Sequence, residues 1–210
     1  MATFRKMLTI GTAGTTLAVT LLAGTVGAPA QTPDLEQQIL KSLLPPSLRI
    51  LTTTPADVSR TADRQFIDSI KNRATRSLTL DEREHIATIA KERPSVDIEV
   101  NFDYNSAKVG PSAMPSVTAL GKALTSPELQ GGTFVLAGHT DAKGSLPSNQ
   151  DLSEKRADAI KRYLIDNFHI PASNLVTVGY GKTKLKNEAD PFAATNRRVQ
   201  IVNMEEKSER

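Results

Sequence analysis

The segment that most constrains the fold is a long helix signal that closely follows a short apolar run. Residues 134–137 are apolar throughout, which is typical of a buried strand. Residues 149–168 contain neither Gly nor Pro and are rich in helix formers. Ser148 with Asp151 three positions later matches a capping box, so we expect a helix that begins near Asn149. The pattern predicts a strand, a loop and a helix that packs on a sheet.

An arginine lies in the apolar stripe of this expected helix. At about 100° per residue, one face carries Leu152, Ala159, Ile160 and Tyr163. Arg156 projects from the middle of that face. An arginine is rarely directed at a core unless a carboxylate or a bound anion meets its donors. The sequence offers two such partners, which are Asp141 in a structural ion pair and a bound ligand.

A carboxylate follows the apolar run directly, in the motif Gly138-His139-Thr140-Asp141. Asn149 lies two helical turns before Arg156, so their side chains reach the same place. A carboxylate and a guanidinium placed in this way suit a zwitterionic ligand. Asn149 also has a simpler interpretation, as a side chain that forms a hydrogen bond within the first turn of its helix.

Four separated motifs, in this order and spacing, resemble the OmpA-like peptidoglycan-binding domain family over residues 95–204. The motifs are Asn101-Phe102-Asp103-Tyr104-Asn105-Ser106, residues 138–157, Val178-Gly179-Tyr180-Gly181 and Asn196-Arg197-Arg198-Val199. The resemblance implies that Asp141 and Arg156 clamp diaminopimelate in the stem peptide of peptidoglycan. The chemistry fits, because the free end of diaminopimelate carries an ammonium and a carboxylate, one for each side chain.

The same resemblance implies ligand contacts for Asn105 and Arg197. Asn105 also suits an ordinary turn after a strand, and Arg198 is interpreted as a solvated strand residue. The family usually has an acidic residue after Gly-Tyr-Gly, where this chain has Lys182 with two further lysines close behind. We interpret these lysines as a solvated basic loop, with a rim that attracts an anionic glycan or lipid surface as the alternative.

The remaining apolar patterns predict an α+β fold. Alternation from Val96 to Phe102 predicts a strand, and residues 117–124 predict a helix that ends before Pro127. Strands are also expected near residues 175–178 and 199–202. The expected order is therefore strand, helix, strand, helix, strand, strand (β-α-β-α-β-β), and the family resemblance implies a mixed sheet with helices packed on one side. A polar tail, residues 205–210, follows this domain.

The first 30 residues have the pattern of an export signal. Arg5 and Lys6 precede an uncharged stretch, and Ala28-Pro29-Ala30 offers a cleavage site of small residues before Gln31. The alternative is an uncleaved membrane anchor, because the uncharged span is long enough to cross a bilayer of about 30 Å. A Gram-negative periplasm, in association with the outer membrane, follows from the family resemblance.

Residues 31–94 predict short helices. An amphipathic pattern over residues 35–44 stops at Pro45-Pro46, a second runs through residues 66–70, and Thr79 with Glu82 predicts a capping box for a third. Two interpretations are open for this extension. It is either a partly disordered tether, or a helical segment that packs on the domain or on an envelope protein or membrane partner.

Several functional classes are not expected. The formal net charge is +3 and there is no cysteine, which argues against nucleic-acid binding and excludes thiolate metal sites. His139 near Asp141 suggests a metal or hydrolase site, but the three histidines show no HExxH pattern and no serine lies in a G-x-S-x-G elbow. We expect no cofactor and no catalysis.

The sequence thus predicts non-catalytic binding of cell-wall peptidoglycan that tethers the protein to the wall. The first alternative is an envelope scaffold or stator-like protein whose N-terminal segment stays in the inner membrane. The second alternative is a peptidoglycan-processing enzyme.

Overall fold

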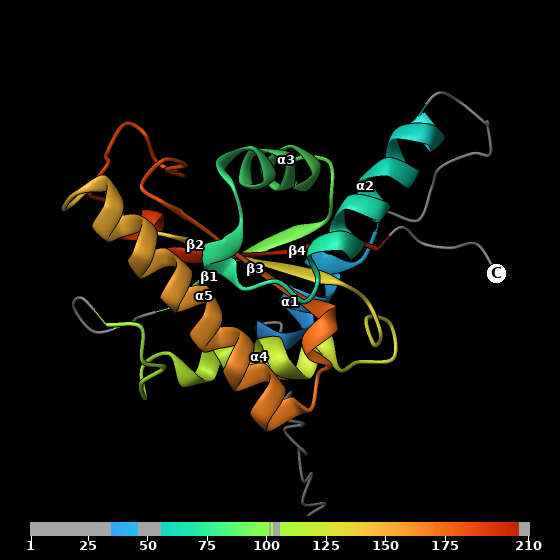
Figure 1. Ribbon diagram of the computed structural model, residues 1–210. Helices are drawn as coiled ribbons and strands as arrows, with labels where there is room; N and C mark the ends of the chain where they lie inside the picture. Colours follow the sequence, from blue (N-terminus) through green and yellow to red (C-terminus); the bar gives the residue numbers. More distant parts are fainter. Residues whose placement is uncertain (1–34, 46–55, 101, 103–105, 206–210) are drawn as a thin grey trace, which may run out of the picture. The chain divides into compact units, whose positions relative to one another are not determined.

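The centre of the fold is a mixed four-stranded sheet. The computed structural model describes residues 35–45, 56–100, 102 and 106–205. The strands are β1 (Ser95–Glu99), β2 (Phe134–His139), β3 (Leu175–Gly181) and β4 (Arg198–Asn203). They lie in the order β1-β4-β2-β3 (Figure 1). Strand β4 is antiparallel to both of its neighbours, whereas β2 and β3 are parallel. The expected α+β class, strand sequence and mixed sheet are confirmed.

The helices of the domain pack on one face of this sheet, as expected. Helix α4 (Met114–Leu124) and helix α5 (Leu146–Phe168) cover that face, and α5 is the crossover between the parallel strands β2 and β3. The core that they share with the sheet contains Val117, Leu120, Phe134, Leu136, Ile160, Leu164, Leu175 and Ile201. This hydrophobic layer between the helices and the sheet therefore holds α5 against β2 and β3, at whose ends the candidate site lies.

Helix α5 begins earlier than the sequence pattern indicated. Its N-cap is Ser145, whose hydroxyl accepts a hydrogen bond from the Ser148 N–H, so the expected capping box of Ser148 with Asp151 is wrong. Pro147 occupies the first turn, where its missing N–H costs nothing. The buried positions of the helix are Asn149, Ser153, Arg156, Ala157, Ile160 and Leu164. The predicted stripe is confirmed for Ile160 and for the core-facing Arg156, whereas Leu152, Ala159 and Tyr163 are only partly buried.

The segment before the domain also forms helices, near the predicted positions. They are α1 (Leu35–Leu43), α2 (Ala56–Ile70) and α3 (Leu80–Ala90). The predicted capping box of Thr79 with Glu82 is confirmed at the start of α3. Helix α1 packs on the same core as α4. In the described ranges, no helix is long and apolar enough to cross a membrane.

Helices α2 and α3 pack on the opposite face of the sheet (Figure 1). Their apolar side chains meet the outer face of β2, β3 and β4 in a second core of Ile67, Ile70, Ile86, Ile89, Val135, Val176, Val178, Tyr180 and Val202. Between α2 and α3, the hydroxyl of Thr75 donates to Asp158 on α5, which also accepts from Thr177 on β3. Both faces of the sheet are therefore covered, one of them by residues that precede the domain.

Candidate ligand site at the start of helix α5

The first turns of α5 lie directly against the ends of β2 and β3. A Cβ atom at Gly138 would be 2.2 Å from the backbone oxygen of Ser153, and one at Gly179 would be 2.5 Å from the Glu154 side chain. Only glycine permits these approaches. Ser153 Oγ then accepts a hydrogen bond from the Gly181 N–H at 2.9 Å. The glycine of the Gly138-His139-Thr140-Asp141 motif thereby brings Asp141 next to the helix that carries Asn149 and Arg156.

The Asp141 carboxylate is mostly buried and already has a cationic partner. Its Oδ2 lies 3.0 Å from Arg197 Nη1, and its Oδ1 accepts a hydrogen bond from the Lys143 N–H at 3.2 Å. The Asp141 side chain is 17% exposed and that of Arg197 is 45% exposed. Two of the predicted ligand residues therefore meet each other in the structure.

Arg156 is buried beside this pair, with 6% of its surface exposed. Its Nε donates to the backbone oxygen of Ser106 at 3.0 Å, and its guanidinium carbon lies 4.8 Å from the centre of the Phe102 ring. Burial lowers the pKa of Arg156, the charge of Asp141 opposes that shift and the charge of Arg197 adds to it. Among the described residues no ion pair joins Arg156 to Asp141, so the structural pair that the sequence offered as an alternative is absent, and Asp141 pairs with Arg197 instead.

Asn149 lies where its simpler interpretation placed it, within the first turns of α5. The side chain is 5% exposed, and its Nδ2 donates to the backbone oxygens of Lys143 and Ser145 at 2.8 and 3.1 Å. It therefore fixes the loop that links β2 to α5, two residues beyond Asp141. Asn105, the remaining predicted contact, lies outside the described residues.

Lys182 has a role that the sequence pattern did not reveal. Its Nζ donates to the backbone oxygen of Gly144 at 2.7 Å and to that of Ala142 at 3.3 Å, so it holds the loop that carries Asp141. Lys184 pairs with Glu84 at 2.8 Å and Lys186 pairs with Asp97 at 2.7 Å. The lysines are therefore partly exposed, as a solvated basic loop would be, but each also has a specific partner that this interpretation did not include. The sequence held one sign of this role, which was Lys182 in the place of the family's usual acidic residue.

Asn196 also shapes the site, although the sequence pattern did not single it out. It is fully buried, and its Oδ1 accepts hydrogen bonds from the N–H groups of Lys186 and Asn187. Its Nδ2 is within 3.0 to 3.2 Å of three backbone oxygens in the same loop. The loop is joined to the Asp141 loop by a bond of 2.9 Å from the Ala142 N–H to the Pro191 oxygen. Arg197 follows this fixed point directly.

The next arginine is not the solvated strand residue that we expected. Arg198 is 8% exposed and its Nε lies 3.2 Å from Asp97 Oδ1, because β4 is an inner strand and pairs with β1. Burial lowers the pKa of Arg198. The neighbouring His139 is also buried, which lowers its pKa to about 3, and its Nδ1 lies 3.1 Å from the backbone oxygen of Lys184. This geometry assigns the ring proton to Nδ1 and leaves His139 neutral.

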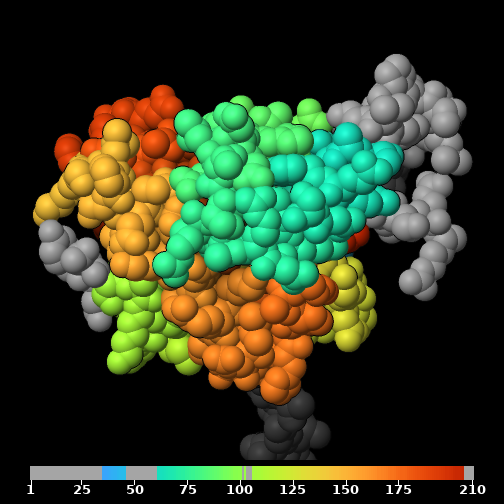
Figure 2. Space-filling model, in the orientation of Figure 1, coloured from blue at the N-terminus to red at the C-terminus, as the bar shows by residue number. Residues whose placement is uncertain are grey.

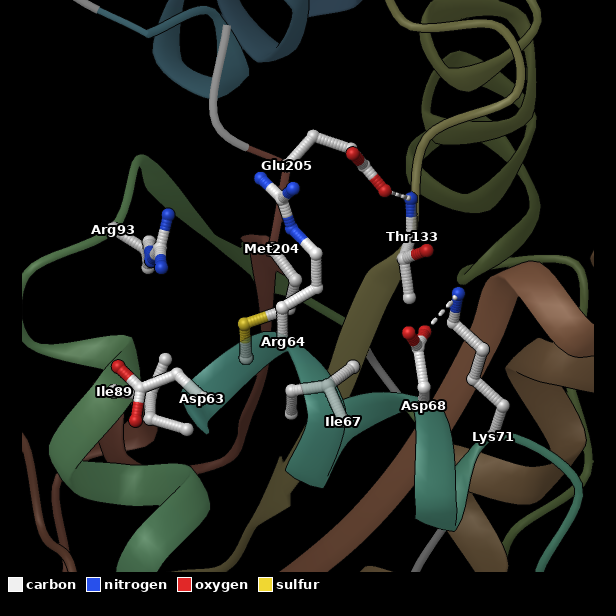
Figure 3. A pocket seen from close by; sticks show the side chains of 10 residues that line it. All are labelled: Asp63, Arg64, Ile67, Asp68, Lys71, Ile89, Arg93, Thr133, Met204 and Glu205. Atoms are coloured by element: carbon white, nitrogen blue, oxygen red, sulfur yellow. Dashed lines mark hydrogen bonds and ion pairs between the residues drawn. The ribbon is translucent and has the colours of Figure 1, made fainter. Parts of the chain in front are cut away.

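The predicted ligand residues Asp141, Arg156 and Arg197 do not line the cavity shown in Figure 3. No group of three or more potential metal ligands is present in the part of the chain that the structure describes. A cavity of about 170 Å³ lies between α2, α3 and the end of β4 (Figure 3). Apolar Ile67, Ile89 and Met204 line it together with charged side chains, and the Asp141 site is elsewhere.

The C-terminal half of the chain is similar to known proteins. Residues 101–198 match the model of the OmpA family. The peptidoglycan-associated lipoprotein of Pseudomonas aeruginosa is 36% identical over 102 residues, which cover 48% of this chain and 58% of that protein. Outer membrane porin F of Pseudomonas fluorescens is 33% identical over 107 residues, which cover 50% of this chain and 32% of that protein. The chain therefore spans less than two thirds of either relative.

A similar solved structure is that of the peptidoglycan-associated lipoprotein from Burkholderia pseudomallei. It is 27% identical, has a TM-score of 0.42, and covers 55% of this chain and 92% of that one. The match of the family model encloses Asp141, Arg156 and Arg197. Residues 101–198 of this chain are a domain of the OmpA family.

Proposed function

We propose that this domain binds cell-wall peptidoglycan without catalysis, through the diaminopimelate of the stem peptide, and so tethers the protein to the wall. The observation that carries the proposal is the convergence of Asp141, Arg156 and Arg197 at the start of α5. One carboxylate and two guanidinium groups match a ligand end that carries an ammonium and a carboxylate. The resemblance to a peptidoglycan-associated lipoprotein supports this chemistry.

The contacts that we propose divide between the charged groups of the ligand. Asp141 accepts hydrogen bonds from the ammonium, while Arg156 and Arg197 donate to the carboxylate. Arg156 is held in place by Ser106 and the Phe102 ring, so its guanidinium loses little freedom on binding. Asn149 acts by fixing the loop after Asp141. Asn105 is a further ligand contact, which we propose from the family motif alone.

Sedimentation with insoluble sacculi tests the proposal. The full chain is mixed with sacculi that contain diaminopimelate, and Asp141→Asn and Arg156→Gln are compared with Asp151→Asn and Lys155→Gln. Asp151 and Lys155 are exposed on the same helix and form an i,i+4 bridge with each other, with no other ion pair among the described residues, so they control for loss of charge. We expect the first two variants to stay in the supernatant and the controls to sediment as wild type does.

Two further measurements sharpen the result. Sacculi with lysine in place of diaminopimelate lack the second carboxylate, so binding to them should be much weaker. Circular dichroism must show that each variant is folded, because loss of one partner of a buried charge pair also destabilises a fold. If folded Asp141→Asn and Arg156→Gln both sediment like wild type, the proposed clamp is wrong. Release of soluble muropeptides by the purified protein would instead support an enzyme.

We also propose that the protein works in the Gram-negative envelope, in the periplasm or at the outer membrane. The export pattern of residues 1–30 supports this location, as do relatives that are named as outer membrane proteins. Mass spectrometry of the protein from cells is the direct test. A mature N-terminus at Gln31 supports cleavage, whereas Met1 or Ala2 supports an anchored scaffold with an envelope partner for residues 31–94.

A further inference from the structure

Helix α3 contacts three elements that build the ligand site, through two consecutive residues. Arg83 Nη2 lies 3.1 Å from Glu154 Oε1 on α5, and both side chains are largely buried, with 18% and 13% of their surfaces exposed. Glu84 Oε2 lies 2.8 Å from Lys184 Nζ in the loop that follows β3. In Figure 2 the green surface of α3 lies against the gold start of α5 and the orange-red segment after β3.

The contact with Glu154 reaches the part of α5 that carries the site. Glu154 Oε1 also accepts from Gln150 Nε2 at 2.7 Å, and the same Nε2 is 2.7 Å from the backbone oxygen of Gly179 on β3. Gln150 and Glu154 are one turn apart on α5. Gln150 directly follows Asn149, and Glu154 stands two residues before Arg156. A displacement of Glu154 would therefore move the turn from which Arg156 projects.

A second contact fixes β3 itself. The Tyr180 hydroxyl donates to the backbone oxygen of Arg83 at 3.0 Å, and burial raises the pKa of Tyr180, so the phenol keeps this proton. Tyr180 stands two residues before Lys182, whose ammonium holds the loop that carries Asp141. Helix α3 thus contacts both sides of the site, the arginine side through α5 and the aspartate side through β3.

The Arg83–Glu154 pair has the energetics of a positioning contact. A largely buried ion pair contributes little net stability, because desolvation of both charges offsets their attraction. Arg83 Nε is buried and has no hydrogen-bond partner among the described residues, which adds a further cost. The geometry that the pair imposes on α5 is therefore a better account of its role than stability.

We propose that α3 is a positioning element of the peptidoglycan site, and that Arg83 sets the place of Arg156 through Glu154. The inference builds on the proposed function, and it extends the binding unit beyond the OmpA family match, which begins at residue 101. Residues 80–90 touch no ligand in this account. These residues hold α5, β3 and the loop after β3 in the arrangement that binds the ligand.

The test compares two ion pairs made by the same helix. Arg83→Met breaks the pair with Glu154, whereas Arg73→Met breaks a pair with Glu82 at 2.5 Å that does not reach α5. Calorimetry with a soluble muropeptide that contains diaminopimelate gives the affinity, and thermal unfolding gives the stability. We expect Arg83→Met to bind about tenfold more weakly and Arg73→Met to bind as wild type does at a similar melting temperature.

A charge exchange distinguishes positioning from general destabilisation. The double variant Arg83→Glu with Glu154→Arg restores the pair with its charges reversed, and we expect it to regain most of the affinity that Glu154→Arg alone loses. If Arg83→Met binds like wild type, or if the charge exchange regains none of the lost affinity, Arg83 does not position the site.

A readout without ligand separates this inference from the proposed function. Failure of the wild-type protein to bind the muropeptide would overturn the proposed function alone. The positioning role is measured in the same samples by NMR, from the Arg156 Nε–H signal and from amide exchange over residues 149–156. We expect Arg83→Met to shift that signal and accelerate that exchange, and Arg73→Met to leave both unchanged. Unchanged values in Arg83→Met would overturn the positioning role whatever the ligand proves to be.

Discussion

Asp141 Oδ2 and Arg197 Nη1 lie 3.0 Å apart, although 56 positions separate the two residues in the sequence. The pair joins the loop after β2 to the residue that precedes β4, and so sets a carboxylate against a guanidinium. In the proposed site, a ligand with both charges would insert between these groups and pair with each, because the Arg197 side chain is 45% exposed.

Replacement of Arg197 by glutamine should separate binding from stability. An ion pair with one exposed partner contributes about 0–1 kcal/mol, so the free energy of unfolding should change little. Affinity for a muropeptide that contains diaminopimelate should fall about tenfold, equivalent to about 1.4 kcal/mol. Calorimetry and urea unfolding measure the two quantities, and Arg162→Gln, exposed on α5, is the charge control. Equal affinities for the two variants would contradict the role assigned to Arg197.

Lys182→Met should weaken binding although Lys182 makes no proposed ligand contact. The substitution keeps a similar length but removes the donors to the Ala142 and Gly144 oxygens, so the Asp141 loop becomes less ordered. We expect a several-fold loss of affinity by calorimetry. Lys186→Met is the matched control, because Lys186 lies nearby but pairs with Asp97. The prediction is wrong if both lysine variants bind equally well.

Gly138→Ala should be strongly destabilising. The new methyl group would lie 2.2 Å from a backbone oxygen of α5, and no side-chain rotation can relieve that overlap. Overpacking of this kind typically costs 1–3 kcal/mol, and we expect about 3 kcal/mol or more here, measured by urea unfolding. Gly110→Ala is the control, since nothing lies within 4 Å of the added atom. A fully stable Gly138→Ala protein would show that α5 can move away from β2.

His139 should make the fold sensitive to mild acid. Its pKa is about 3 in the folded protein, because burial disfavours the charged ring, against about 6.5 when unfolded. Between these values the unfolded chain binds a proton that the folded chain does not, so stability falls as pH falls through this window. From pH 7 to pH 5 the loss should be up to about 2 kcal/mol.

Urea unfolding at pH 7 and pH 5 measures the effect of His139, above the range in which most carboxylates titrate. His139→Gln keeps a donor for the Lys184 oxygen but cannot take up the proton, so its stability should vary less over the same interval. Parallel pH profiles of the two proteins would mean that His139 is not the group responsible.

Local sequence patterns predicted the elements well where neighbouring residues decide the structure. The Thr79 and Glu82 capping box and the stop before Pro45 were both readable, because each involves adjacent turns of one helix. The start of α5 was not, since Ser145 and Ser148 are both acceptable caps and Pro147 suits the first turn of the earlier one. The choice depends on contacts with β2 and β3, which a local pattern does not contain.

The sequence predicted candidate site residues but not how they pair with one another. Arg156 stood out because a charge in an apolar stripe needs a partner, but the structure supplies Ser106 and Phe102 rather than Asp141 among the described residues. The partner of Asp141 comes from the other end of the domain, and the charges around Lys182 depend on a helix outside it. Such pairings follow from tertiary packing, which sequence spacing alone does not determine.

Asn196 gives the loop before β4 a fixed shape through one side chain, and Arg197 is the next residue. The backbone of Arg197 is therefore fixed, while its side chain reaches the Asp141 carboxylate and stays 45% exposed. If Arg197 contacts the ligand as we propose, adjustment to ligands of differing geometry requires only rotamer changes of this one side chain, at a cost in side-chain entropy of about 2 kcal/mol at most. Under the proposed function, binding and release of the ligand would then exchange the Asp141–Arg197 pair without refolding of the loop.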